Sequence, residues 1–174
     1  PKRVYDLYAN HNARANAKPK YADTASSVIQ INIMSPLQIS MWNANGVSRH
    51  KNKLAQFLFE KNTDVMLLSE THLTDKHNFH IPGYLFYATN HPDGKAHGGT
   101  GILIRSRIKH HLYNRTEMDY LQSTSISMQS SSGPVTLVAV YCPPRFVVSE
   151  DQFLEFFNSL GERFIAAGDY NAKH

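Results

Sequence analysis

The sequence predicts a layered α/β fold that is built around mixed β-structure. Strand-like segments alternate with two helix-like segments, which is typical of an α/β layered architecture. The segment 110–142 reads as a series of strands joined by short turns, so antiparallel pairing is expected, unlike the fully parallel sheet of a dinucleotide-binding fold. Within it, the run VTLVAVYC is apolar on both faces, which predicts a central strand.

The first half of the domain contributes a strand, a helix and then further strands. Ser48 stands where it could cap a helix over residues 49–61. In that helix Leu54, Phe57 and Leu58 recur at helical spacing and are expected to face inward. The segment 71–98 is rich in turn signals and is interpreted as mostly loop. The expected strands of this half are residues 37–42, 64–70, 84–88 and 101–105.

The second half is expected to hold a three-stranded meander, one helix and a last strand. Ser149 and Gln152 form a capping box ahead of an apolar stripe at helical spacing, and Gly161 ends the helix. The stripe consists of Phe153, Phe156, Phe157 and Leu160. The expected strands are residues 110–114, 121–128, 134–142 and 163–168.

Length and composition predict one intracellular domain with a basic N-terminal extension. The chain has 174 residues, which is enough for one domain with its own core. Cys142 is the only cysteine, so an internal disulfide is excluded and a reducing compartment fits. No apolar run reaches the roughly 20 residues of a membrane span, and no signal peptide is visible. We therefore expect a nuclear or cytoplasmic protein rather than a secreted one.

Residues 1–35 differ in composition from the rest. Five of the 18 basic residues but only two of the 14 acidic residues fall within 1–35. No sustained periodicity is present there, apart from one short helix-like stretch near residues 4–14. We interpret 1–35 as a flexible linker, or as a basic tail that follows nucleic acid, and 36–174 as the folded domain.

Four of the expected strands finish in polar residues, and such strand ends are where active sites of α/β proteins gather. A carboxylate there can hold a divalent cation such as Mg²⁺, and a second carboxylate can deprotonate a water. Amide and phenol groups can hold phosphate oxygens. The combination predicts metal-assisted phosphodiester hydrolysis, although each residue by itself also fits a turn, a strand-end acid or a core-edge tyrosine. The residues concerned are Asn43, Asn45, Glu70, Tyr141, Asp169 and Asn171.

Four motifs in order resemble the exonuclease–endonuclease–phosphatase superfamily. They are WNANG (42–46), SETHL (69–73), VYCPPR (140–145) and GDYNAKH (168–174). The residues of these motifs, together with IPGY (81–84) and HGGTGILIR (97–105), are most similar to those of the endonuclease domain of jockey-like, non-LTR retrotransposons of insects. The resemblance covers about residues 36–174 and implies a sandwich of two mixed sheets with helices outside.

The resemblance also implies a role for each residue at the strand ends. Glu70 and Asn43 are expected to hold Mg²⁺, with Mn²⁺ as an alternative ion. Tyr141 is expected to contact the scissile phosphate, and Asp169 to orient or activate the attacking water. Asn171 is expected to bind a phosphate oxygen, as is Asn45.

The implied activity is nicking of target DNA, whose freed 3′ end primes reverse transcription. The implied partners are DNA and, in a full element, a reverse transcriptase domain and element RNA, without a membrane. The family pattern continues past GDYNAKH to a Ser-Asp-His motif, so an incomplete second half and an inactive isolated chain are expected. The alternatives are a remnant that at most binds nucleic acid, and a phosphatase of the same superfamily.

Two further groups of residues suggest binding. The histidines of the loop-rich region lack cysteine partners and zinc-like spacing, so they are interpreted as polar loop side chains rather than zinc ligands. Arg105, Arg107 and Lys109 form a basic stretch after a strand, which either contacts the DNA backbone or is a solvated turn. The histidines are His72, His77, His80, His91 and His97.

Overall fold

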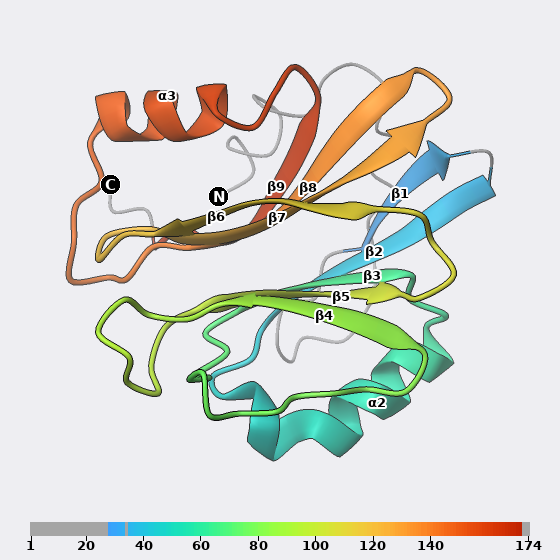
Figure 1. The fold of residues 1–174 in the computed structure, drawn as a ribbon, viewed down its shortest axis with the longest axis horizontal. Helices are drawn as coiled ribbons and strands as arrows, with labels where there is room; N and C mark the ends of the chain where they lie inside the picture. The colour runs from blue at the N-terminus through green and yellow to red at the C-terminus, as the bar shows by residue number, and fades with distance from the viewer. Residues whose placement is uncertain (1–27, 34, 172–174) are drawn as a thin grey trace, which may run out of the picture.

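Two β-sheets lie face to face, with one α-helix on the outer face of each (Figure 1). The fold is that of a computed structural model, which describes residues 28–33 and 35–171. The first sheet has the order β1-β2-β3-β5-β4, and the second has the order β6-β7-β8-β9. The predicted two-sheet sandwich with outer helices is confirmed.

The first sheet is mixed, because β2 and β3 run parallel while its other pairs are antiparallel. Its strands are β1 (Val28–Ile33), β2 (Ser35–Asn43), β3 (Val65–Ser69), β4 (Tyr84–Thr89) and β5 (Thr100–Arg105). All five residues of β3 are buried. A strand that is covered on both faces needs apolar residues at successive positions, which VMLL supplies.

The second sheet is an antiparallel meander extended by one parallel strand, so it is mixed as well. Its strands are β6 (His111–Glu117), β7 (Gln122–Ser130), β8 (Gly133–Tyr141) and β9 (Phe164–Asp169). β8 lies between β7 and β9, as its apolar sequence predicted.

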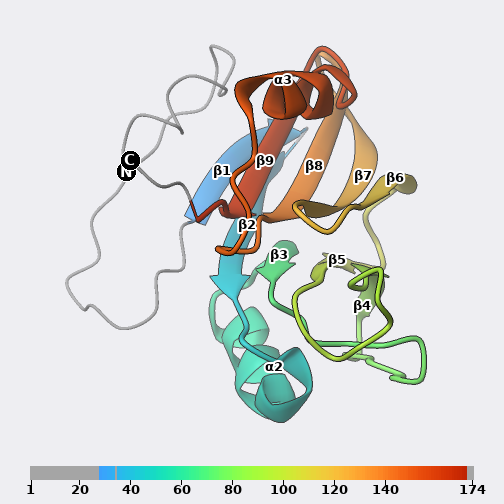
Figure 2. The same ribbon diagram turned by 90° about the vertical axis from the view of Figure 1, so that its left-hand side faces the viewer.

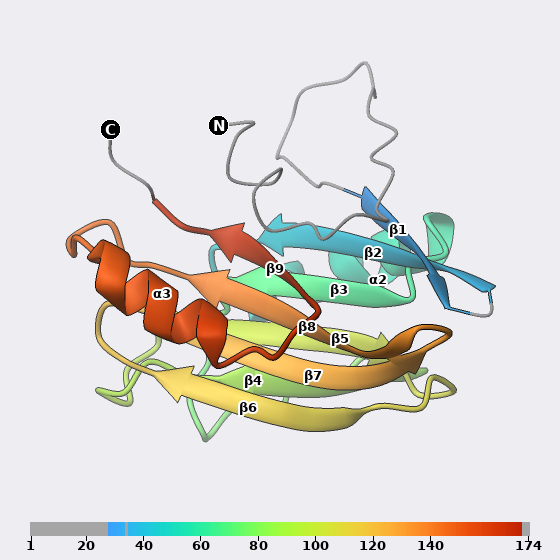
Figure 3. The ribbon, with the colours of Figure 1, turned by 90° about the horizontal axis from the view of Figure 1, so that it is seen from above.

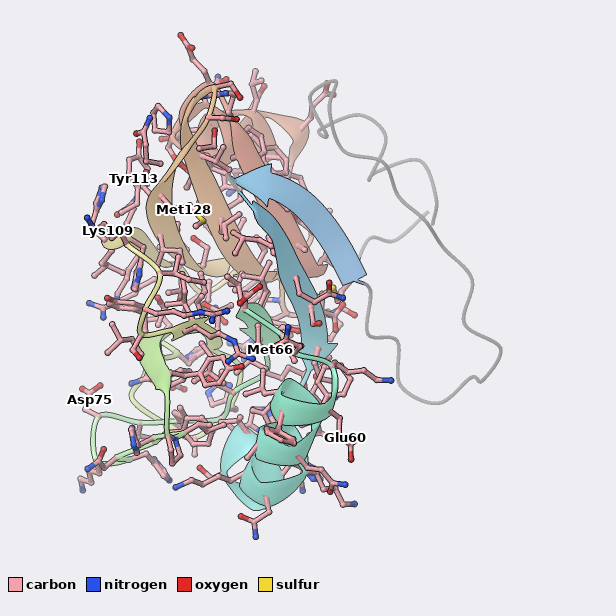
Figure 4. All side chains as sticks on the ribbon, turned by 90° about the vertical axis from the view of Figure 1, so that its right-hand side faces the viewer. Glu60, Met66, Asp75, Lys109, Tyr113 and Met128 are labelled. Carbon is pink, nitrogen blue, oxygen red and sulfur yellow. The ribbon has the colours of Figure 1, made fainter. Side chains whose placement is uncertain are left out.

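The main core fills the space between the sheets, and two smaller cores lie under the helices. In Figure 4, Met128 lies on the second sheet in the main core, whereas Met66 lies between the first sheet and α2. Figure 2 shows the helices on opposite outer faces of the sandwich, α2 below the first sheet and α3 above the second. Each helix closes one apolar face of a sheet against water.

Helix α2 (Lys51–Glu60) begins later than the sequence predicted, and Ser48 does not cap it. Ser48 lies inside a 3₁₀ helix, η1 (Val47–His50), that leads directly into α2. A residue in that tight turn lacks the extended backbone that an N-cap needs. The inward face is otherwise as expected, since Leu54 and Leu58 are buried.

Helix α3 (Glu150–Asn158) begins at the predicted capping box. The Ser149 side chain accepts a hydrogen bond from the Gln152 backbone, and the Gln152 side chain accepts one from the Ser149 backbone. Two backbone donors of the first turn are thus satisfied. Beyond the helix, Gly161 has a φ of +85°, a conformation that glycine adopts without steric cost.

Regular structure begins earlier than residue 36. Strand β1 spans Val28–Ile33 and pairs antiparallel with β2, although the sequence placed these residues in the linker. The segment VIQINI alternates apolar and polar residues, which is the pattern of a strand with one covered face. The expected helix near residues 4–14 and the rest of the linker lie outside the described residues. In the described part of the chain, no helix has the length and apolar character needed to span a membrane.

Candidate active site at the strand ends

The predicted site residues of four strands meet at one end of the sandwich. In Figure 3 the arrowheads of β2, β3, β8 and β9 all point toward the same end of the molecule. The parallel registers place Asn43 beside Ser69 in the first sheet and Tyr141 beside Asp169 in the second. Parallel pairing is what brings these ends together, because it aligns the carboxyl ends of neighbouring strands.

Asn43 joins the two acidic residues of this site. Its amide nitrogen donates to Glu70 Oε1 at 3.0 Å and to Asp169 Oδ2 at 2.9 Å, which links residues 126 positions apart. Its amide oxygen accepts a hydrogen bond from the Asn45 backbone N–H at 3.1 Å. Since carboxylates only accept and a backbone N–H only donates, this network sets the orientation of the amide. Asn43 therefore faces the carboxylates with its nitrogen.

Glu70 follows directly after β3 in a left-handed backbone conformation, with a φ of +51°. Its carbonyl accepts from the Gly46 backbone N–H at 2.8 Å, and the Ser69 carbonyl accepts from the Ala44 N–H at 2.8 Å. The turns after β2 and β3 are thus tied together. A left-handed residue other than glycine persists only where its surroundings hold it, and here it directs the Glu70 carboxylate toward Asn43.

His72 lies beside Glu70, with its Nε2 atom 3.6 Å from Glu70 Oε2. Burial of the ring lowers the pKa of His72, the Glu70 carboxylate opposes this shift, and Arg49 and His97 add to it. The sequence grouped His72 with the loop histidines and did not place it at the site. Its position in SETHL, two residues after Glu70, was the available signal.

Tyr141 is buried at the end of β8, with 7% of its surface exposed. Burial raises the pKa of Tyr141 to about 12, and the nearby carboxylates of Glu70 and Asp169 contribute to the shift. The phenol therefore keeps its proton at neutral pH and remains a hydrogen-bond donor. A side chain at Gly98 would lie 3.2 Å from the Tyr141 ring, so Gly98 allows the loop before β5 to approach the ring closely.

Asp169 and Asn171 are held by a tight turn at the end of β9. The Asn171 backbone N–H donates to Asp169 Oδ1 at 3.2 Å, and the Asn171 amide donates to the Cys142 carbonyl at 2.9 Å. The Cys142 N–H in turn donates to the Asp169 carbonyl at 2.9 Å. Both carboxylate oxygens of Asp169 thus have a donor, one from Asn171 and one from Asn43.

These contacts define the strand-end cluster, which consists of Asn43, Glu70, Tyr141, Asp169 and Asn171. Asn45 lies at its rim, exposed, and its carbonyl accepts a hydrogen bond from Arg49. The carboxylates of Glu70 and Asp169 are hard oxygen donors of the kind that Mg²⁺ prefers. The donor chemistry of the cluster therefore fits a divalent cation.

The basic stretch after β5 does not join the strand-end cluster. Residues 65 and 104 are paired in the β3–β5 register, so Arg105 lies at the end of the sheet opposite Glu70. Arg105 and Arg107 both contact Asp64, at 3.3 Å and 3.2 Å. Lys109 is exposed beyond them, on the edge of the molecule (Figure 4). The antiparallel direction of β5, which the sequence pattern did not reveal, accounts for this placement.

Two stacked mixed sheets, with one helix on the outer face of each, define the fold class of this chain. The sequence model of the Endonuclease/Exonuclease/phosphatase family matches residues 42–174. This chain belongs to that family.

Two relatives of this chain are proteins of mobile elements. The RNA-directed DNA polymerase from mobile element jockey of Drosophila melanogaster is 42% identical over 140 residues, which are 79% of this chain and 15% of that protein. The probable RNA-directed DNA polymerase from transposon X-element of the same species is 37% identical over 81% of this chain and 16% of that protein. The chain thus spans about a sixth of the length of these relatives.

A solved structure shows the same fold. The endonuclease domain of TRAS1, a telomere-specific non-LTR retrotransposon, superimposes with a TM-score of 0.60 over 79% of this chain and 61% of that domain, at 17% identity. The likeness extends across both sheets. This chain is therefore an endonuclease/exonuclease/phosphatase domain that is similar in sequence to retrotransposon proteins.

Proposed function

We propose that the strand-end cluster hydrolyses phosphodiester bonds of DNA, and that the chain serves as the nicking endonuclease of a non-LTR retrotransposon protein. The observation that carries this proposal is the Asn43 amide, which donates to Glu70 and Asp169 at the same time. The shared donor keeps the two carboxylates at one place, where they can serve as an oxygen ligand for a cation and as a proton acceptor for a water.

Glu70 is the residue that would hold a divalent cation, Mg²⁺ or Mn²⁺. When bound, such an ion polarises a phosphoryl oxygen. Asn43 was predicted to bind the ion as well, but in the observed orientation its nitrogen faces the carboxylates. We propose that Asn43 orients Glu70 and Asp169 rather than contacting the ion.

The other members of the cluster suit the handling of phosphate and water. The protonated Tyr141 phenol is a donor that can bind a phosphate oxygen as charge develops. Asp169 accepts hydrogen bonds at both oxygens and so is fixed in place to take a proton from a water. Asn171 uses one amide proton on the Cys142 carbonyl and retains a second for phosphate, and the exposed Asn45 amide can reach substrate from the rim.

The biological setting is proposed from the relatives. A nick in target DNA frees a 3′ end that a polymerase can extend, and the matched relatives are RNA-directed DNA polymerases of mobile elements. We propose target DNA as the substrate, with the polymerase domain and the RNA of the element as partners.

Metal binding and DNA cleavage together test the proposal. Mn²⁺ binding is measured by electron paramagnetic resonance, and nicking of supercoiled plasmid is measured with Mg²⁺. Glu70→Gln should weaken Mn²⁺ binding by about tenfold or more, because a direct ligand is worth at least as much as an outer-shell partner, and should abolish nicking. The matched control is Glu60→Gln, an exposed carboxylate on α2 (Figure 4), which should change neither.

Three outcomes separate the alternatives. If the 174-residue chain binds Mn²⁺ through Glu70 and binds DNA but does not cleave it, the isolated chain is inactive, as the sequence predicted. The catalytic part of the proposal then fails for this chain, and the nucleic-acid-binding alternative holds. If Glu70→Gln and wild type bind Mn²⁺ equally, the proposed ion site is wrong. Release of phosphate from a 3′-phosphorylated oligonucleotide without plasmid nicking would indicate a phosphatase instead.

A further inference from the structure

A second group of metal-ligating side chains lies in the loop between β4 and β5. It consists of His91, Asp93 and His97, which we call the loop cluster. In residues 28–33 and 35–171, this is the only group of at least three histidine, cysteine or acidic side chains whose ligand atoms all lie close together, within 4.8 Å of one another. The sequence interpreted these histidines as polar loop residues, so their convergence is a result of the fold.

Both imidazole rings face the same carboxylate. His91 Nδ1 lies 2.9 Å from Asp93 Oδ1, and His97 Nε2 lies 2.8 Å from Asp93 Oδ2. The two rings are 3.9 Å apart between centroids. A tetrahedral zinc ion has bonds of about 2.0–2.2 Å, which place its ligand atoms roughly 3.3 Å apart. The three ligand atoms therefore need only small side-chain rotations to surround a cation.

His91 is the buried member of the loop cluster. The ring is 3% exposed, and its Nε2 atom is buried without a hydrogen-bond partner in the described part of the chain. The Asp93 backbone N–H also points at Nδ1, at 3.3 Å. Nδ1 is therefore the ring nitrogen of His91 that faces the Asp93 carboxylate, and it is the ligand atom that His91 offers to the loop cluster.

The backbone of the loop holds the three side chains in place. The Lys95 N–H donates to Asp93 Oδ1 at 2.9 Å, and the Gly94 N–H donates to the His91 carbonyl at 3.0 Å. Gly94 has a φ of +72°, which permits this tight turn. A ligand carboxylate that is oriented by a backbone donor is typical of metal sites.

The loop cluster is connected to the strand-end cluster through the backbone. The Gly98 carbonyl, one residue after His97, accepts from the His72 N–H at 3.0 Å, and the Gly99 carbonyl accepts from the Thr71 N–H at 3.3 Å. These donors directly follow Glu70 in the chain. A cation that fixes His97 would therefore also restrain the segment beside the proposed active site.

We propose that His91, Asp93 and His97 bind a divalent transition-metal ion of the zinc class, at a site separate from the one proposed at Glu70. Imidazole ligands select such ions over Mg²⁺, which prefers oxygen ligands. Three protein ligands leave a fourth position for water. The other histidines of the region are not part of the site, since His77 bonds to Thr74 and His80 is exposed.

Cobalt titration of the metal-free 174-residue chain tests the proposal, because tetrahedral Co²⁺ absorbs strongly in the visible range. We expect one tight site, from which Zn²⁺ displaces Co²⁺. His97→Gln and Asp93→Asn should each weaken binding by at least about tenfold. His77→Gln and His80→Gln are matched controls that should bind as wild type does. Circular dichroism of each metal-free variant shows that it is folded.

The outcome does not depend on the proposed nuclease activity. Glu70→Gln should leave the Co²⁺ spectrum and affinity unchanged, so the loop site can hold even if the strand-end proposal fails. Absence of tight Co²⁺ binding, or loss of binding in His80→Gln to the same extent as in His97→Gln, would overturn the proposal.

Discussion

The strand-end cluster and the loop cluster both join carboxylates to nitrogen-bearing side chains, but they are assembled in different ways. Asn43 and Asp169 are 126 residues apart and meet because two sheets stack with aligned strand ends. His91, Asp93 and His97 fall within seven residues and meet through one turn. The first cluster therefore depends on the whole sandwich, whereas the second depends mainly on a loop.

This difference has a physical consequence. Ordering residues that are far apart in the chain costs conformational entropy, and the packing of the entire core offsets that cost. Damage to a sheet should therefore disperse the strand-end cluster. A short chelating loop retains its ligands near one another even when distant strands shift. The two clusters should thus respond differently to the same substitution in a sheet.

The largest effect is expected from Gly168→Ala in β9. A side chain at Gly168 would collide with the backbone of Val140 in the neighbouring strand, including its carbonyl oxygen. Backbone atoms cannot move aside as a flexible side chain can, so β9 should separate from β8 at a cost of about 3 kcal/mol or more. Urea denaturation measures this loss. The displaced Asp169 should also weaken Mn²⁺ binding, while Co²⁺ binding at the loop cluster persists.

Gly83→Ala is the matched control for this substitution. Gly83 has a φ of +82°, but an added methyl group there meets no atom within 4 Å. It should cost only the backbone strain, about 1 kcal/mol, and leave both metals bound. Equal destabilisation by the two substitutions would show that the contact between β8 and β9 does not hold Asp169 in place.

An intermediate effect is expected at Asn43, where two substitutions separate geometry from charge. Asn43→Ala removes two hydrogen bonds to carboxylates and should cost about 1–3 kcal/mol. Asn43→Asp keeps the shape but places a third carboxylate against Glu70 and Asp169, so it should destabilise the metal-free protein more than Asn43→Ala does. Thermal melts with and without Mg²⁺ measure both, and Mg²⁺ should raise the melting temperature most in Asn43→Asp. Equal melting temperatures for the two variants with no response to Mg²⁺ would contradict the proposed role of Asn43.

The smallest effect is expected in the titration of His72, which contacts the strand-end cluster and lies near His97 of the loop cluster. Burial lowers the pKa of His72, so its titration midpoint in a nuclear magnetic resonance pH series should fall below 6.5. Because the folded state favours the neutral ring, the stability that His72 contributes is present above pH 6.5 and is lost as the pH falls through its folded-state pKa.

Glu70→Gln tests the cause of the His72 pKa shift. The Glu70 carboxylate raises the pKa of His72 against the effect of burial, so its neutralisation should lower the midpoint further. A midpoint that rises in Glu70→Gln, or one at or above 6.5 in wild type, would show that burial does not dominate at this position.

Most secondary-structure elements of the fold could be predicted from residue patterns within short segments of the sequence. The alternation and apolar runs of the sequence predicted most strands, and the Ser149–Gln152 capping box marked the start of α3 correctly. The errors also have local causes. A 3₁₀ helix shifted the start of α2 past Ser48, and β1 was overlooked because its six residues follow a tract without periodicity.

The candidate site could be predicted from the sequence only in part. The motifs named the residues that converge at the strand ends, but not that the Asn43 amide turns its nitrogen toward the carboxylates, nor that His72 stands beside Glu70. Arg105 followed an apolar strand in the same way as the site residues do, yet it lies at the opposite end of the sheet because β5 runs antiparallel to β3. Strand direction is a long-range property, so a local pattern does not reveal it.

By itself, the sequence determined the alternation of strands and helices, the capping box of α3, the family motifs and the identity of the acidic and amide residues. These features depend on neighbours within a few positions of the chain. Only the tertiary structure decided which ends of the strands meet, which atoms of Asn43 face the acids, and that two histidines and an aspartate converge beside Gly98. Those outcomes depend on sheet direction and register, which are set by the packing of the two sheets against each other.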